Sequence, residues 1–196
     1  MKIIKLFPQN HKRLQTQTKN TVTPDLTIQI CIASYHDFLH SISAKWEKLS
    51  NKDLFEIEKH TSRYLNFLNA KKEEQYSFII NKNPYLSIYE IPKHWPIEAK
   101  KLLKERINRK YYSNDFDIAY FPCLLECGFK EIIINDLSYN ILILLQQEKT
   151  FHDLLNKLLS CFSTKIKEDK DQPYRLVITE LEYLLYNGLI YTTPLK

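Results

Sequence analysis

Apolar and polar residues follow different patterns in the two halves of this chain. Residues 9–24 are polar and rich in Gln, Thr, Asn and Lys, so we expect an arm over residues 1–24. From Leu26 to Ile32 apolar residues alternate with polar ones, and from Tyr35 onward they recur at helical spacing. We therefore predict a helix over about residues 30–49.

The remainder of the first half shows helical spacing interrupted by breaks. The turn residues Asn51 and Asp53 precede a second predicted helix that ends near Asn69. A charged loop over 70–75 and a strand or short helix over 76–80 follow, and Asn83-Pro84 ends this stretch. Pro96 suits the first position of a basic helix predicted over 97–110. The polar residues 113–115 indicate a domain boundary.

The second half is more regularly patterned. Residues 120–126 and 130–135 are predicted strands, and Gly128 lies in the short turn that joins them into a hairpin. Asn135 or Asp136 can cap a helix that runs to Gln146. Thr150 can cap the next helix.

The end of the chain completes this pattern. Residues 163–173 form a predicted charged loop, and a third helix is predicted over 174–187. Gly188 follows where a helix C-cap favours glycine. The predicted fold is α+β, with a mostly helical part over 25–114. A winged-helix-like domain, a β-hairpin plus three helices, follows over 115–196.

Four short motifs follow one another in this second part. The strand-to-helix step is Ile134-Asn135, followed by Ile141-Leu142 in the first helix and by Lys149-Thr150-Phe151 at the start of the second helix. The last motif is the ending Leu184-Leu185-Tyr186-Asn187-Gly188-Leu189-Ile190. In this order the motifs resemble those of the PqqD-like family, also called RiPP recognition elements. Leu137 and Ser138 depart from the pattern, because the family usually has a small hydroxyl residue and alanine after the asparagine.

The resemblance implies a peptide-binding function. Family members bind the leader of a ribosomally made precursor peptide, which adds as a strand to the sheet and lies against the third helix. An exposed strand edge offers unpaired N–H and C=O groups that an extended peptide can satisfy. Carried over to this chain, the peptide-binding residues are Lys130, Glu131, Ile132, Ile133, Ile134, Asn135, Arg175, Tyr183 and Tyr186.

The whole layout is similar to the MbnC-type proteins of methanobactin biosynthesis. These proteins have no catalytic site and pair with a TIM-barrel iron enzyme that converts precursor cysteines to oxazolone and thioamide groups. The similarity implies a non-catalytic subunit without a cofactor, and iron in the partner enzyme. The basic helix then suggests a docking surface for that partner, with the candidate residues Trp95, Lys101, Lys104 and Arg106.

Composition narrows the functional classes further. The chain has only 2 glycines in 196 residues and lacks the glycine-rich motifs that bind nucleotide phosphates. The net charge of +5 allows an acidic partner without requiring nucleic acid. No secretory signal follows Met1, and no apolar run is long enough to cross a membrane, so we expect a cytoplasmic protein with reduced thiols.

Two side-chain pairs suggest metal binding, but each has a simpler interpretation. His36 and His40 are spaced i, i+4 on a predicted helix, yet Asp37 stands where the zinc-protease motif requires Glu, and no third ligand is evident. Cys123 and Cys127 would lie about 13 Å apart along a strand, too far for one metal ion. We therefore expect no metal site and interpret these cysteines as small buried apolar residues.

DNA binding and catalysis are the alternative functions. Winged helices often bind DNA, but the predicted third helix carries Glu180 and Glu182 beside Arg175, and carboxylates repel phosphates. A DNA-binding regulator is thus the second hypothesis, and we do not expect nucleic acid as the main partner. No paired carboxylates or nucleophile–base arrangement stands out, although the members of a catalytic triad need not be close in sequence.

Overall fold

The protein has an α+β fold, as predicted. The computed structural model describes residues 26–46, 49–50, 52–53, 55–56, 59, 64–107, 115–123, 128–169 and 171–194. Its helices are α2 (Leu26–Trp46), α4 (Tyr64–Leu68), α5 (Lys72–Gln75), α6 (Ile97–Arg106), α7 (Asp136–Leu144), α8 (Phe151–Cys161), α9 (Thr164–Glu168) and α10 (Gln172–Tyr186). The strands are β1 (Phe78–Lys82), β2 (Ser87–Tyr89), β3 (Asp117–Cys123), β4 (Gly128–Ile134), β5 (Lys149–Thr150) and β6 (Ile190–Pro194).

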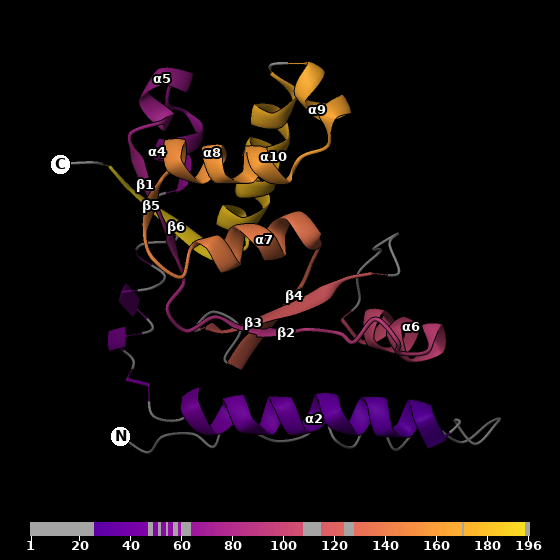
Figure 1. Ribbon diagram of the computed structural model, residues 1–196. Coiled ribbons are helices and arrows are strands. Elements are labelled where there is room, and N and C mark those ends of the chain that lie inside the picture. Colours follow the sequence, from indigo (N-terminus) through magenta and orange to yellow (C-terminus); the bar gives the residue numbers. More distant parts are fainter. Residues whose placement is uncertain are drawn as a thin grey trace.

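The sheet β2–β3–β4 lies between two groups of helices. In Figure 1, α2 runs below this antiparallel sheet, whereas α7, α8 and α10 lie above it. α6 lies beside the end of the sheet, close to α2. The middle layer is thus covered on both faces, and β3 and β4 supply buried residues to both.

Alternate residues of β3 and β4 serve two separate cores. Ala119 and Ile132 belong to the core shared with α7, α8 and α10. Ile118, Tyr120 and Ile133 belong to the core shared with α2 and α6. Because successive side chains of a strand point to opposite faces, two buried faces leave no polar alternation in Ile132-Ile133-Ile134.

The predicted start of the first helix was wrong. α2 already includes Leu26, although the apolar residues of this stretch alternate as in a strand. Tyr35 is fully buried, and Ile28 and Ile32 pack against the same core. Leu26 and Ile30 are exposed on the helix surface. The residues buried from this segment are therefore those on one face of the helix. The alternation of apolar and polar residues at its start does not indicate a strand.

The local caps of the second half are confirmed. The Asn135 side chain accepts a hydrogen bond from the Ser138 N–H at 2.8 Å, and Thr150 accepts one from the Asp153 N–H at 3.1 Å. Gly188 has φ 76°, a conformation that favours glycine at the end of α10. The predicted loops were partly wrong, because 70–75 includes α5 and 163–173 includes α9.

Strands from both halves of the chain pair with one another. β1 pairs with β6 near the C-terminal end, and β2 pairs with β3, so each sheet combines strands from either side of residue 114. The prediction included neither β2 nor β6. The two predicted domains therefore share their hydrogen-bonded sheets.

Several predictions concern residues that lie outside the part of the chain described by the structure. The arm 1–24, the hairpin turn around Cys127 and the boundary at 113–114 are among them. Within the described part of the chain, no helix combines the length and hydrophobicity that crossing a membrane requires.

Candidate functional site

The outer edge of β4 presents backbone groups that the sheet does not use. In an antiparallel pair, the N–H and C=O groups of successive residues point alternately toward the partner strand and away from it. Pro122 has no N–H and lies opposite Phe129, so this pair fits a position without ladder hydrogen bonds. The same alternation turns the backbone groups of Phe129, Glu131 and Ile133 away from β3. Among the described strands, none pairs with this side of β4.

α10 lies beside this edge. The Tyr183 hydroxyl donates a hydrogen bond to the Ile133 carbonyl oxygen at 2.8 Å, which agrees with an outward orientation of that carbonyl. Two residues further along the chain, just after β4, the Asn135 amide donates to the Glu180 carboxylate at 3.2 Å. Residue numbers therefore rise along β4 while they fall along α10, so the strand and the helix run in opposite directions.

We call this region the edge site. It consists of the outward backbone groups of Phe129, Glu131 and Ile133 together with Tyr183 and Tyr186 of α10. Tyr186 follows Tyr183 by one helical turn, in the direction of Glu131, and 71% of its surface is exposed. An extended segment placed here would meet backbone hydrogen-bonding groups on one side and tyrosine rings on another.

The predicted isoleucines contribute to this site through their position in the strand. Ile132 and Ile134 are buried in the core under α7 and α10, and Ile133 is buried in the core over α2. Their side chains are thus occupied in packing, and what β4 offers a ligand is its main chain. Lys130 is partly exposed and faces Phe121 in the ladder.

Asn135 connects β4 to both α7 and α10. Its side-chain oxygen caps α7, and its amide nitrogen bonds to both oxygens of the Glu180 carboxylate at 3.2 Å. The Ser138 hydroxyl also donates to Glu180. These contacts use the side chain of Asn135 inside the fold, so it fixes the position of α10 relative to the strand.

Arg175 lies away from the edge site. It precedes Glu180 on α10, and Glu180 already meets the residue that follows β4. Tyr186 lies eleven positions after Arg175, which corresponds to about 16 Å along a helix. The structure thus brings Tyr183 next to β4 and places Arg175 beyond the end of the strand.

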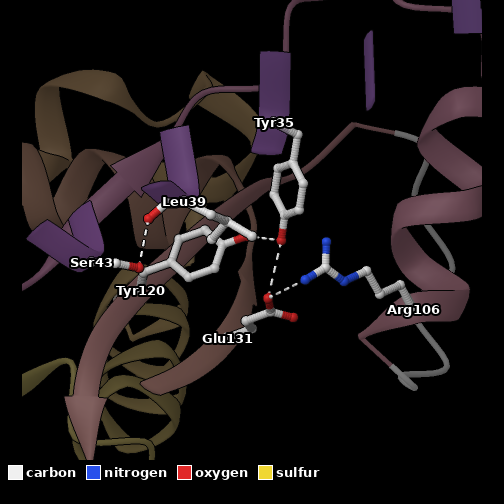
Figure 2. A network of polar contacts seen from close by, with 6 residues as sticks. All are labelled: Tyr35, Leu39, Ser43, Arg106, Tyr120 and Glu131. Atoms are coloured by element: carbon white, nitrogen blue, oxygen red, sulfur yellow. Dashed lines mark hydrogen bonds and ion pairs between the residues drawn. The ribbon is translucent and has the colours of Figure 1, made fainter. Parts of the chain in front are cut away.

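The face of β4 toward α2 carries a partly buried polar network, shown in Figure 2. The Tyr35 hydroxyl of α2 donates to the Glu131 carboxylate at 3.2 Å, and the Tyr120 hydroxyl donates to Tyr35. Arg106, the last residue of α6, approaches the same Glu131 oxygen at 3.5 Å. One side chain of β4 therefore joins the strand to both α2 and α6.

Burial dominates the ionisation of this network. Loss of hydration raises the pKa of Glu131, and the nearby Arg106 charge and the Tyr35 hydrogen bond oppose this rise. Burial also raises the pKa of Tyr35, followed in importance by the negative charge of Glu131. The carboxylate thus bears a desolvation cost that its two partners only partly offset.

The predicted docking residues have different environments. Trp95 is buried in the α2–α6 core and packs against Tyr89, with ring centroids 5.9 Å apart. Lys101 is exposed, and Lys104 lies 5.1 Å from the centre of the Phe116 ring. Of the four, Trp95 stabilises the core, whereas Lys101, Lys104 and Arg106 project from α6.

Of the candidate metal ligands, the structure describes the side chains of His36 and His40. His36 packs edge-on against Tyr35, and His40 is exposed on α2. Cys31 is buried, Cys161 is exposed, and Cys127 lies outside the described residues. Within the described ranges, no three His, Cys, Asp or Glu side chains are close enough to hold a metal ion.

Sequence reasoning missed the partners of Glu131. Tyr35 was predicted only as part of an apolar helix face, and Tyr120 only as a strand residue. The tyrosines themselves were a weak signal, because the hydroxyl of a buried Tyr usually forms a hydrogen bond. Nothing in the local pattern indicated that Tyr35 would meet a residue 96 positions away.

Comparisons with protein-family models, with curated proteins and with solved structures found no match to this chain, so the family resemblance stays a prediction.

Proposed function

We propose that this protein binds the leader of a ribosomally made precursor peptide as an added strand at the edge site and presents it to a modifying enzyme. The main observation behind this proposal is the outer edge of β4. There, backbone groups of Glu131 and Ile133 point away from the sheet, beside α10. Main-chain hydrogen bonds provide affinity in this binding mode, and the flanking side chains provide selectivity.

The surroundings of β4 support strand addition. The strand is held from both faces by buried isoleucines, so its edge is rigid before a peptide arrives. Preorganisation of this kind lowers the entropic cost of binding. Tyr183 already satisfies the Ile133 carbonyl, which limits how far an incoming strand pairs along β4.

The further steps of the proposal rest on the resemblance to MbnC-type proteins. The chain leaves the chemistry to a TIM-barrel iron enzyme, which converts cysteines of the bound precursor to oxazolone and thioamide groups. The exposed residues of α6, with Lys101 among them, are the proposed docking surface for that enzyme.

Charge on α10 argues against the DNA-binding alternative. A recognition helix needs side chains that reach base edges and phosphates. Among the described exposed residues of α10, Arg175 is offset by Glu182, and Leu176 and Tyr186 are uncharged. Such a surface has little attraction for a phosphate backbone.

Where the genes beside this one encode a short, cysteine-bearing precursor, synthetic peptides that tile its leader provide the test. Binding is measured by fluorescence anisotropy, and we expect a micromolar dissociation constant for one tile. N-methylation is then moved along that tile one residue at a time. Because alternate N–H groups of an added strand face β4, methylation should weaken binding about 2- to 10-fold at every second position.

The peptide scan leaves the protein unchanged, so misfolding cannot produce the alternating result. Uniform effects along the tile would argue against a strand. Tight binding to duplex DNA with a steep salt dependence, without binding of any tile, would favour the regulator hypothesis instead.

A further inference from the structure

Arg106 lies where it can contact a strand added to β4. Its side chain reaches Glu131 from the side opposite to Tyr120 of β3, as Figure 2 shows. The guanidinium carbon lies 5.1 Å from the centre of the Tyr35 ring, and 28% of the Arg106 side chain is exposed. Ring contact and ion pair together hold this cation next to the outer edge of the strand.

The Arg106 guanidinium retains hydrogen-bonding capacity. A guanidinium has five N–H donors, and the contact with Glu131 uses one nitrogen at 3.5 Å, which is long for a charged hydrogen bond. The same Glu131 oxygen also accepts from Tyr35. Within the described residues, Glu131 is the carboxylate that pairs with Arg106.

Strand geometry places one side chain of a bound peptide beside this pair. Facing residues on neighbouring strands have Cβ atoms about 5 Å apart, and their side chains lie on the same face of the sheet. A peptide residue opposite Glu131, or diagonal to it, would thus project toward α2 and α6. Its side chain would lie next to Arg106, whereas its neighbours would project toward α10 and Tyr183.

We propose that Arg106 selects a carboxylate at this position of the bound peptide. An Arg side chain can bridge two carboxylates because its planar fork offers donors in two directions. A peptide carboxylate would add a second counter-charge to a cation whose present ion pair is long. The net charge of +5 also favours the approach of an acidic peptide. This inference rests on the proposed strand addition and specifies the ligand that the edge site prefers.

The experiment uses acetylated nine-residue peptides in which Thr and Val alternate and a single Glu replaces one residue in turn. Binding to the full chain is followed by the NMR shifts of the Glu131 and Ile133 amides. We expect the Glu peptide to bind about 3- to 10-fold more tightly than its Gln counterpart at one face of the strand only. The other face should show no preference for charge.

Protein variants then identify the cation responsible. Arg106→Gln should abolish the preference for Glu, and Arg106→Glu should reverse it in favour of a Lys peptide. Arg106→Lys retains the charge without the fork and should retain part of the preference. Lys157→Gln removes a charge from an exposed position of α8 and should leave the preference unchanged. Circular dichroism verifies that each variant is folded.

The possible results separate this inference from the proposed function. If Glu and Gln peptides shift the β4 amides with equal affinity, strand addition stands and the role of Arg106 is overturned. The same conclusion follows if Arg106→Gln retains the preference. If neither the designed peptides nor the leader tiles affect the β4 amides, both proposals fail.

Discussion

The two faces of the sheet formed by β2, β3 and β4 are stabilised by different kinds of interaction. The face toward α7, α8 and α10 is covered by apolar side chains such as Ile132 and Ile134. The face toward α2 and α6 combines apolar packing with the hydrogen-bonded group of Tyr35, Tyr120 and Glu131. One strand, β4, supplies the central residues of both faces.

This difference separates stability from positioning. Apolar burial is non-directional and stabilises many arrangements of similar packing. A buried polar group must instead keep its partners in place, because an unsatisfied group costs free energy. We therefore infer that the apolar face supplies most of the folding energy, whereas the polar face fixes α2 and α6 relative to the edge of β4.

The largest expected effect is on the apolar face. Ile132→Ala removes a fully buried side chain and should lower the free energy of unfolding by about 2–5 kcal/mol, because a cavity remains in the core. Urea unfolding measures this loss. Ile143→Ala, a partly exposed position on α7, is the control and should cost less than about 1 kcal/mol. Equal losses would show that the face is not packed as described.

An intermediate effect is expected on the polar face. Tyr35→Phe retains the ring but leaves the Tyr120 hydroxyl without its acceptor and leaves Glu131 with Arg106 alone as its donor. We expect a loss of about 1–3 kcal/mol in unfolding free energy. Tyr89→Phe removes a hydroxyl that bonds to exposed Ser34 at 3.2 Å, and it should cost less than about 1 kcal/mol. A Tyr35→Phe variant as stable as Tyr89→Phe would refute the network.

The smallest effect is a dependence on pH. Burial raises the pKa of Glu131 in the folded protein, so the folded state binds this proton more tightly than the unfolded chain does. The stabilisation due to Glu131 is complete below the unfolded pKa of about 4.3 and is lost as pH rises through the folded pKa. Glu131→Gln should therefore lose less stability than wild type as the pH rises above the unfolded pKa.

The measurement for this last prediction is urea unfolding of both proteins at several pH values. Other carboxyl groups are common to the two proteins and cancel in the difference between their unfolding free energies. Parallel curves would mean that Glu131 ionises in the folded protein as it does in the unfolded chain.

Local features were predictable where a few adjacent residues determine them. The N-caps at Asn135 and Thr150 and the glycine after α10 depend on neighbouring backbone groups, and the structure has all three. The start of α2 was mispredicted because its first turns contain apolar residues at both helical and alternating spacing. β2 was missed because a strand of three residues has too few positions to show a pattern.

The candidate site was only partly predictable. The outer edge of β4 and Tyr183 were among the predicted residues, and the structure brings them together at 2.8 Å. Arg175 was also predicted, but it lies beyond the strand because the direction of α10 relative to β4 depends on the Asn135–Glu180 contact. The role of Arg106 beside the strand required the position of α6, which no local pattern reports.

By itself, the sequence determined that Ile132-Ile133-Ile134 forms a strand and that helices follow it. β-branched side chains restrict the backbone locally, and caps act over three or four residues. Only the tertiary structure decided which helices cover each face of β4, and that Glu131 meets Tyr35 and Arg106. Those contacts join residues far apart in the chain. They form because the folded chain buries particular apolar surfaces against one another. Many surfaces of similar composition could pack in this way, so local periodicity does not predict which ones do.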